Sequence, residues 1–283
     1  MKKNMATKKK KSMKKLMPAA VVFAVLISLL ISSLIPQPIE LYARGAIVMD
    51  AATGRVLFEK NMNERLTPSS MTKLMAVLLV FENIAAGNLS LDEKVVVSTR
   101  AVSTIASRAG IREGEAQTVE TLIISAMLPS GSEAVIALGE HMFGSEEAFV
   151  EEMNQKARAL SLENTSFQNS VGLTHSDNFS SAYDMAVLTR YFITNFPEIL
   201  YYASLTSHTL IHEDGSETLM RNTNDMLNIE GVTGLKTGSA PNSGFSLALT
   251  YERNGRSLII VVFSSPVAQL RRLDILTLLE RFG

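Results

Sequence analysis

The stretch Pro68-Ser69-Ser70-Met71-Thr72-Lys73, followed by the apolar run LMAVLLVF at residues 74–81, decides how the rest of this chain is interpreted. Apolar side chains fall on every face of a helix drawn from Ser70 to Glu82, which predicts a helix that is buried all round. Lys73 is the only charged residue of that helix before Glu82. Because burying an ammonium is costly unless it is paired or neutral, a lysine one turn into a core helix indicates a function.

Ser70 suggests what that function is, because residues three apart lie on the same face of a helix. The Ser70 hydroxyl and the Lys73 amine are therefore expected to be neighbours at the helix N-terminus. A desolvated, neutral amine can take the proton of a hydroxyl and make it a nucleophile. A serine three residues before a lysine is common by chance, so the pair needs support from elsewhere in the chain.

Composition limits what the pair can belong to. The chain has 283 residues, 46% of them hydrophobic, which is enough for one large domain or two small ones. Eight of its 27 basic residues lie within the first 15 positions, and the remainder carries 19 basic against 28 acidic residues. This excess of acidic residues after position 15 argues against nucleic-acid binding. The absence of cysteine excludes disulfides and thiolate chemistry and suits an extracytoplasmic protein.

The N-terminal segment predicts a membrane location. Residues 1–15 form a basic tail, and residues 16–35 carry no charge over a length that can span a bilayer. We expect a single-pass protein of the cell membrane, with a cytoplasmic N-terminus, a spacer at 36–44 and an extracytoplasmic catalytic domain at 45–283. A signal peptide is the competing interpretation, although Leu41-Tyr42-Ala43 is a poor cleavage site.

The rest of the chain predicts an α+β domain. Residues 46–49 and 55–58 flank a glycine turn and predict a hairpin. Further helices are predicted over residues 118–128, 133–143 with Ser132 as N-cap, 146–161, 182–195 and 267–281, and strands over 95–98, 208–212, 218–220, 233–239, 244–251 and 258–263. The expected architecture is an antiparallel sheet built from both chain ends, with flanking and inserted helices.

Two further motifs follow Ser70 and Lys73 in order. Ser130-Gly131-Ser132 links two predicted helices, and Lys236-Thr237-Gly238 lies on a predicted strand. A Ser-x-x-Lys motif, a Ser-x-Asn-like link and a Lys-Thr-Gly motif form the constellation of penicillin-binding proteins and serine β-lactamases. Each motif alone is a weak signal, whereas the three together, in order and in suitable local structure, are a strong one.

From about Gly45 to Pro266 the chain resembles the D-alanyl-D-alanine carboxypeptidases, which are low-molecular-mass penicillin-binding proteins and serine peptidases. The resemblance is carried by the stretches at 50–54, 68–73, 128–134, 149–154, 172–173, 181–184, 222–224 and 234–238. It implies a penicillin-binding-protein or β-lactamase-like transpeptidase fold, with a cleft between the sheet and the helical region.

The resemblance also implies roles for particular residues. Ser70 would attack the carbonyl of the penultimate D-alanine of a peptidoglycan stem peptide ending in D-Ala-D-Ala, with Lys73 as base. Ser130 would relay a proton to the departing D-alanine. The substrate-binding groups would be Ser132, Lys236, Thr237 and Ser239, where Lys236 and Thr237 hold the terminal carboxylate and the backbone N–H groups of Ser70 and Ser239 form the oxyanion hole.

The same resemblance implies β-lactam antibiotics as covalent inhibitors and requires neither a metal nor an organic cofactor. His208 and His212 could share one side of a strand, but no carboxylate cluster accompanies them in the sequence. They are expected to be exposed hairpin residues rather than metal ligands.

Two positions depart from the family pattern and leave alternatives open. Ser132 stands where the family usually has asparagine, and Ala240 where it usually has threonine. Both changes remove polar side-chain atoms that could contact the substrate. A catalytically weakened peptidoglycan-binding or sensing protein is therefore one alternative. A serine β-lactamase is another alternative. Ser176-Asp177-Asn178 matches the second motif of that family but lies too late in the chain. That family also needs a glutamate that activates water, and Glu163, in a predicted loop, is the best candidate for it.

Overall fold

The computed structural model describes residues 23–24, 26–27 and 38–283. Residues 41–283 form one compact unit, which begins inside the segment predicted as a spacer. The basic tail at 1–15 and most of the predicted anchor at 16–35 lie outside the described residues. Within the described ranges, no helix combines the length and the apolar character that crossing a membrane requires.

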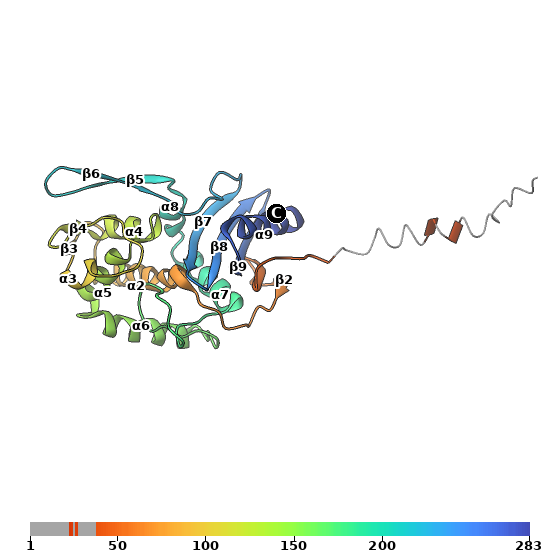
Figure 1. The fold of residues 1–283 in the computed structure, drawn as a ribbon, viewed down its shortest axis with the longest axis horizontal. Helices are drawn as coiled ribbons and strands as arrows, with labels where there is room; N and C mark the ends of the chain where they lie inside the picture. The colour runs from red at the N-terminus through yellow and green to blue at the C-terminus, as the bar shows by residue number, and fades with distance from the viewer. Residues whose placement is uncertain (1–22, 25, 28–37) are drawn as a thin grey trace, which may run out of the picture. The chain divides into compact units, whose positions relative to one another are not determined.

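A five-stranded antiparallel sheet joins the two ends of the compact unit (Figure 1). Its spatial order is β2-β1-β9-β8-β7. The strands are β1 Gly45–Asp50, β2 Val56–Lys60, β7 Val232–Ala240, β8 Gly244–Arg253 and β9 Arg256–Ser265. Asn254 and Gly255 both have positive φ angles, of 52° and 76°, which the tight turn between β8 and β9 requires. The predicted α+β class is confirmed, and β7 lies at the edge of the sheet.

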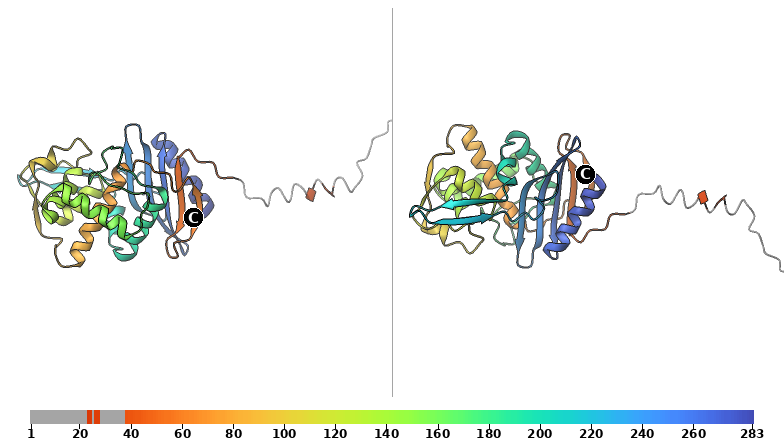
Figure 2. Two further views of the ribbon diagram at one scale, coloured as in Figure 1. Left: turned by 90° about the horizontal axis from the view of Figure 1, so that it is seen from below. Right: turned by 90° about the horizontal axis from the view of Figure 1, so that it is seen from above.

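Helices cover both faces of this sheet (Figure 2). Helix α7, Ala182–Asn195, packs on β1 and β9 on the side of the helical region, and α9, Ala268–Phe282, packs on β8 and β9. Successive residues of β9 are therefore all buried from Leu258 to Phe263, which explains why that strand is continuously apolar.

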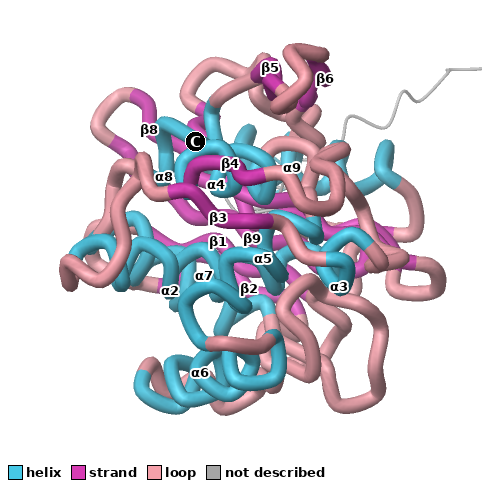
Figure 3. The backbone as a smooth tube through the Cα atoms, turned by 90° about the vertical axis from the view of Figure 1, so that its left-hand side faces the viewer, coloured by secondary structure: helices cyan, strands magenta, loops and turns pink. Residues whose placement is uncertain are grey.

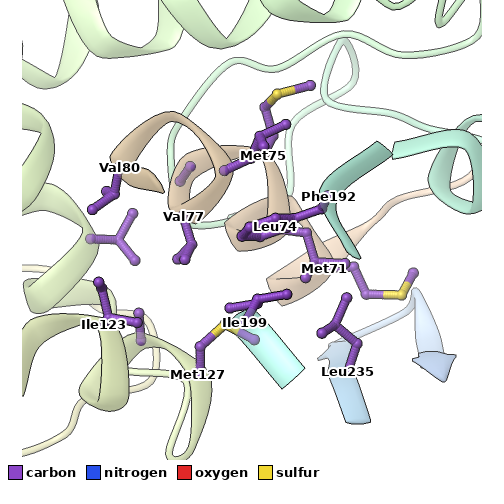
Figure 4. Packing of buried hydrophobic residues seen from close by; sticks show 14 of the residues in the cluster. Met71, Leu74, Met75, Val77, Val80, Ile123, Met127, Phe192, Ile199 and Leu235 are labelled. Carbon is purple, nitrogen blue, oxygen red and sulfur yellow. The ribbon is translucent and has the colours of Figure 1, made fainter. Parts of the chain in front are cut away.

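The centre of the helical region is α2, Lys73–Ala85, which follows a short 3₁₀ helix, η1, Ser69–Thr72. All side chains from Lys73 to Phe81 are buried. Figure 4 shows residues of η1 and α2 packed against Ile123, Met127 and Leu235. Burying each large apolar side chain contributes about 1.5–3 kcal/mol. The predicted burial of the helix is thus confirmed, but its first turn is 3₁₀ and α2 continues to Ala85.

Around α2 lie α4 Val119–Met127, α5 Ser132–Phe143 and α6 Glu146–Ala159. The ribbon of β3 Lys94–Val96 and β4 Ala116–Thr118 contacts α5 and α4 (Figure 3). The prediction that Ser132 caps α5 was wrong: Gly131 is the N-cap and Ser132 is the first helical residue. The Ser132 N–H is instead bonded to the Ser107 carbonyl at 2.8 Å, so a neighbouring loop takes the place of a side-chain cap.

The remaining elements are α3 Thr99–Val102, α8 Ile199–Ser204 and the hairpin of β5 Ser207–Ile211 and β6 Glu217–Arg221. The prediction that His212 is exposed was wrong, because its side chain is buried. Its Nδ1 lies 2.9 and 3.0 Å from the two carboxylate oxygens of Glu115, and its Nε2 lies 2.8 Å from Thr218 Oγ1. His212 therefore ties this hairpin to the loop before β4.

Candidate active site

The structure brings Ser70 and Lys73 together at the start of the central helix. Lys73 Nζ lies 3.0 Å from Ser70 Oγ and donates to the Val171 carbonyl at 2.9 Å. The Lys73 side chain is fully buried. One of its protons is therefore directed to a fixed carbonyl, which leaves the nitrogen lone pair of a neutral amine available for the Ser70 hydroxyl.

The loop at residues 169–173 fixes that carbonyl. Asn169 Oδ1 accepts hydrogen bonds from the N–H groups of Val171, Gly172 and Leu173 at 3.3, 2.7 and 2.8 Å. Gly172 has a φ of 87°, and a Cβ there would lie 1.8 Å from the Ser69 carbonyl oxygen. Only glycine allows the loop to approach the nucleophile turn this closely.

Burial and a neighbouring positive charge lower the pKa of Lys73, the predicted base. Desolvation, followed by the nearby Lys236 ammonium, lowers the pKa of Lys73 well below its ordinary value of 10.5, and Glu133 opposes the shift. Burial lowers the pKa of Lys236 to about 7. A neutral Lys73 at neutral pH is what a general base next to a serine requires.

A cleft of 290 Å³ opens above this pair. Of the residues predicted for the site, Ser70, Ser130, Thr237 and Ser239 line it. Lys73 and Lys236 are fully buried and are not among the described residues that line the cleft. Ser132 is fully buried and does not line the cleft, so the predicted contact of Ser132 with substrate stays a prediction.

The link at Ser130 is conformationally strained. Ser130 has a φ of 65°, which a residue with a Cβ rarely adopts. Its Oγ is buried and, within the described part of the chain, has no hydrogen-bond partner. Such a group in a cleft is available to a bound molecule. The next residue, Gly131, has no room for a side chain, because a Cβ would lie 2.8 Å from both Ala109 Cβ and the Ser125 carbonyl oxygen.

Further residues at the Thr237 end of the cleft were missed by sequence reasoning. Thr223 Oγ1 lies 2.7 Å from Thr237 Oγ1. Arg271, on α9, lines the same cleft, is buried and is bonded to Asp225. Thr223 belongs to a stretch already noted for its family resemblance, whereas no local pattern marks Arg271. Asp225 lines this end as well and offsets the charge of Arg271. The hydroxyls of Thr223 and Thr237 and the guanidinium of Arg271 are donors suited to a carboxylate.

A serine and a buried lysine at the start of a core helix, beside an edge strand that carries Lys-Thr-Gly, define the class of penicillin-binding proteins and serine β-lactamases. The model of the family described as D-alanyl-D-alanine carboxypeptidase matches residues 32–266. The chain belongs to this family.

Individual relatives agree with that assignment. The D-alanyl-D-alanine carboxypeptidase DacF of Bacillus subtilis is 36% identical over 245 residues, which cover 84% of this chain and 61% of the relative. The crystal structure of DacD from Francisella tularensis superposes with a TM-score of 0.83 at 29% identity, covering 87% of this chain and 71% of that one. Penicillin binding protein 6B from Escherichia coli gives a TM-score of 0.80 at 33% identity, covering 87% and 78%. The chain thus spans about three-fifths of the length of the Bacillus relative. These likenesses confirm the predicted transpeptidase fold.

Proposed function

We propose that this chain is a serine D-alanyl-D-alanine carboxypeptidase that releases the terminal D-alanine from peptidoglycan stem peptides and is acylated by penicillin. The observation that carries the proposal is the 3.0 Å approach of Lys73 Nζ to Ser70 Oγ at the floor of a cleft that Ser130 and Thr237 also line. Family membership supplies the class of substrate.

Acylation begins when the substrate's terminal carboxylate binds at Lys236, Thr237 and Arg271. Neutral Lys73 takes the Ser70 proton as Oγ attacks the carbonyl carbon of the penultimate D-alanine. The N–H groups of Ser70 and Ser239 stabilise the oxyanion, and each such donor typically lowers the barrier by about 3–4 kcal/mol. The C–N bond then breaks, leaving an ester on Ser70.

The departing nitrogen needs a proton to leave as an amine. Ser130 donates its hydroxyl proton to that nitrogen and is reprotonated from Lys73, which returns to the neutral state. Water then attacks the ester, and Ser70 regains its proton as the shortened peptide leaves. A β-lactam enters the same sequence, but its leaving nitrogen stays tethered to the acyl group, which slows the attack of water.

For the whole protein, we infer a location at the outer surface of the cell membrane. The support is the order of the basic tail at 1–15 and the uncharged run at 16–35 in the sequence. In this arrangement the catalytic unit meets peptidoglycan outside the cell. Protease digestion of intact and permeabilised cells would locate the catalytic unit, and cleavage only after permeabilisation would overturn this part of the proposal.

The first test is the intact mass of the protein after incubation with a penicillin, beside the Ser70→Ala variant. The expected result is an increase by one drug molecule that the variant does not show. Release of D-alanine from a peptide ending in D-Ala-D-Ala then measures turnover. Acylation without D-alanine release would favour the weakened binding or sensing protein, which the burial of Ser132 outside the cleft also favours.

A further inference from the structure

The link at residues 130–132, which carries Ser130, is supported by a loop from a distant part of the chain. This loop, residues 103–115, joins α3 to β4 without a helix or strand of its own. Ser107 belongs to the loop and lines the cleft together with Ser130. The carbonyl of Ser107 accepts the Ser132 N–H at 2.8 Å. The loop is therefore both a wall of the cleft and a support of the link.

A single carboxylate oxygen binds this loop to α5. Glu133 is the second residue of α5 and is fully buried. Its Oε1 accepts hydrogen bonds from the N–H groups of Ala109, Gly110 and Ile111 at 2.8, 2.9 and 3.3 Å. Arg108 Nε lies 3.8 Å from the same oxygen. Because a buried charge is costly unless it is paired and hydrogen-bonded, these donors explain how Glu133 is tolerated, and charge-assisted bonds of this kind hold a loop firmly.

The link itself is fixed between the loop and α4. The Gly131 N–H donates to the Ser125 carbonyl of α4 at 2.8 Å, and a Cβ at Gly131 would lie 2.8 Å from Ala109 Cβ in the loop. The two residues that follow Ser130 are thus bonded to different parts of the fold, one to α4 and one to the loop. The strained φ of 65° at Ser130 persists because both of these neighbours are held.

The Ser130 hydroxyl depends on this backbone support more than the nucleophile does. Within the described residues, no hydrogen bond holds Ser130 Oγ, so the backbone of the link determines where the hydroxyl lies. Ser70 Oγ, by contrast, lies 3.0 Å from Lys73 Nζ and belongs to η1. A displacement of about 1 Å is enough to slow a reaction step strongly. A loosened loop is therefore expected to impair the proton transfer from Ser130 more than the attack by Ser70.

We propose that Glu133 is a positioning residue for Ser130. By binding the N–H groups of residues 109–111, it holds the loop whose Ser107 carbonyl fixes the link, and so sets the position of the hydroxyl that protonates the leaving nitrogen. Glu133 is not among the described residues that line the cleft, so it acts through Ser130 and does not touch the substrate. The inference rests on the proposed function and deepens it.

The test uses two substrates that differ in one atom: diacetyl-L-lysyl-D-alanyl-D-alanine, and its thioester analogue with sulfur in place of the nitrogen of the terminal D-alanine. The peptide nitrogen must be protonated to leave, whereas a thiol with a pKa of about 8.5 leaves as the thiolate. Glu133→Ala should reduce kcat/KM for the peptide about ten- to hundredfold more than kcat/KM for the thioester. An equal loss with both substrates overturns the proposal.

The ratio of the two kcat/KM values isolates the positioning role. Loss of folded protein affects both substrates equally. Glu133 also raises the pKa of Lys73, but a change there acts on the attack of Ser70, which both substrates require. Glu133→Gln keeps an oxygen that can accept the three N–H groups without the charge, so its ratio should stay within about threefold of the wild-type ratio. A loss in Glu133→Gln as large as in Glu133→Ala would assign the effect to charge and overturn the positioning role.

Two further variants serve as controls. Asp184 is also a buried carboxylate in the first turn of a helix, and it holds a loop outside the cleft by accepting the Asn164 N–H at 2.8 Å and the Thr165 hydroxyl at 2.7 Å. Asp184→Ala should lose stability and keep the wild-type ratio. When Ser130→Ala is the background, adding Glu133→Ala should change the ratio little, because the group that Glu133 positions is gone. A full additional loss in that background would contradict a role through Ser130.

Amide hydrogen exchange separates this inference from the proposed function, because it needs no turnover. The N–H groups of residues 109–111 and of Ser132 should exchange about tenfold faster in Glu133→Ala than in the wild type, and at the wild-type rate in Asp184→Ala. Unchanged exchange overturns the inference even where D-alanine is released. If the wild type releases no D-alanine, the carboxypeptidase assignment fails, and acylation by penicillin, whose leaving nitrogen needs the same proton, replaces the peptide in the comparison with the thioester.

Discussion

At the scale of single residues, the site depends on two buried lysines. Lys73 and Lys236 are both fully buried, and burial lowers the pKa of each amine. The charge of Lys236 lowers the pKa of Lys73 further. Two amines in one apolar region destabilise the fold but serve the chemistry, because one must be neutral and the other must attract an anion. The role of Lys236 predicts how both activity and stability depend on pH.

Lys236 should limit activity at high pH. With a pKa lowered to about 7 by burial, it loses its charge above that pH and no longer attracts the substrate carboxylate. We expect kcat/KM for a D-Ala-D-Ala peptide to fall above about pH 7, mainly through KM. In Lys236→Arg, whose guanidinium stays charged, the fall should move to higher pH, while the exposed control Lys94→Arg keeps the wild-type profile. If kcat/KM of Lys236→Arg fell above the same pH as that of the wild type, the proposed role of Lys236 would be contradicted.

The same lysine should reduce stability. Below about pH 7 Lys236 is protonated in both the folded and the unfolded state, so the full cost of its buried charge is present. As pH rises from about 7 towards the ordinary pKa of 10.5, the folded protein binds fewer protons than the unfolded one, and that cost falls. Lys236→Met should therefore raise the free energy of unfolding by about 1–4 kcal/mol at pH 6 and by less at pH 9. Urea unfolding at the two pH values checks this, and a gain that grows with pH would contradict it.

At the scale of elements, the nucleophile turn is held by close backbone contacts. Gly172 lies against the Ser69 carbonyl on one side, and on the other a Cβ at Gly238 of β7 would lie 2.7 Å from the Pro68 carbonyl oxygen. Two glycines from distant segments thus allow a loop and a strand to enclose η1. The strained φ of Ser69 persists because these neighbours leave the turn no other conformation.

Gly172→Ala should therefore disrupt the site. The new Cβ meets backbone at 1.8 Å and the φ of 87° is also unfavourable, so we expect a loss of stability of more than about 2 kcal/mol and little penicillin acylation. Gly87→Ala is the matched control, because Gly87 has a φ of 76° with nothing within 4 Å of its added Cβ. That control should lose about 1 kcal/mol and keep acylation. Equal losses in the two variants would show that conformational strain alone, and not the contact with Ser69, sets the requirement for glycine.

At the scale of the whole compact unit, its first residues are joined to its C-terminal part at Asp274 on α9. Its buried carboxylate accepts the N–H groups of Tyr42 and Ala43 at 2.7 and 2.9 Å and the Ser265 hydroxyl at 2.8 Å. This explains why residues 41–44 belong to the compact unit rather than to the predicted spacer. The first strand of the sheet starts directly after this contact.

Asp274→Asn should weaken the whole unit, because an amide places donors against the backbone donors that the carboxylate now satisfies. We expect a loss of about 1–3 kcal/mol and a melting temperature lower by several degrees, measured by thermal unfolding. Asp177→Asn, on an exposed loop, should shift the melting temperature by less than a degree or two. A melting temperature unchanged in Asp274→Asn would mean that this contact between the start of the compact unit and α9 contributes little to stability.

The sequence by itself determined the fold class, because periodicity and turn residues are local signals. The continuous apolar run at residues 74–81 marked the central helix, and glycine turns marked the hairpins of the sheet. Three motifs in order were enough for the resemblance to the family. The short helices α3 and α8 were missed, since four and six residues are too few to show a period.

The tertiary structure alone decided which polar groups meet. His212 and Glu115 are 97 residues apart, and Lys73 and Val171 are 98 apart, so no local pattern relates either pair. The same holds for Arg271 in the cleft and for Glu133 and the loop that it binds. The sequence specifies which residues can do chemistry, but their environment, and with it their pKa values and partners, arises only when distant segments exclude water from the same place.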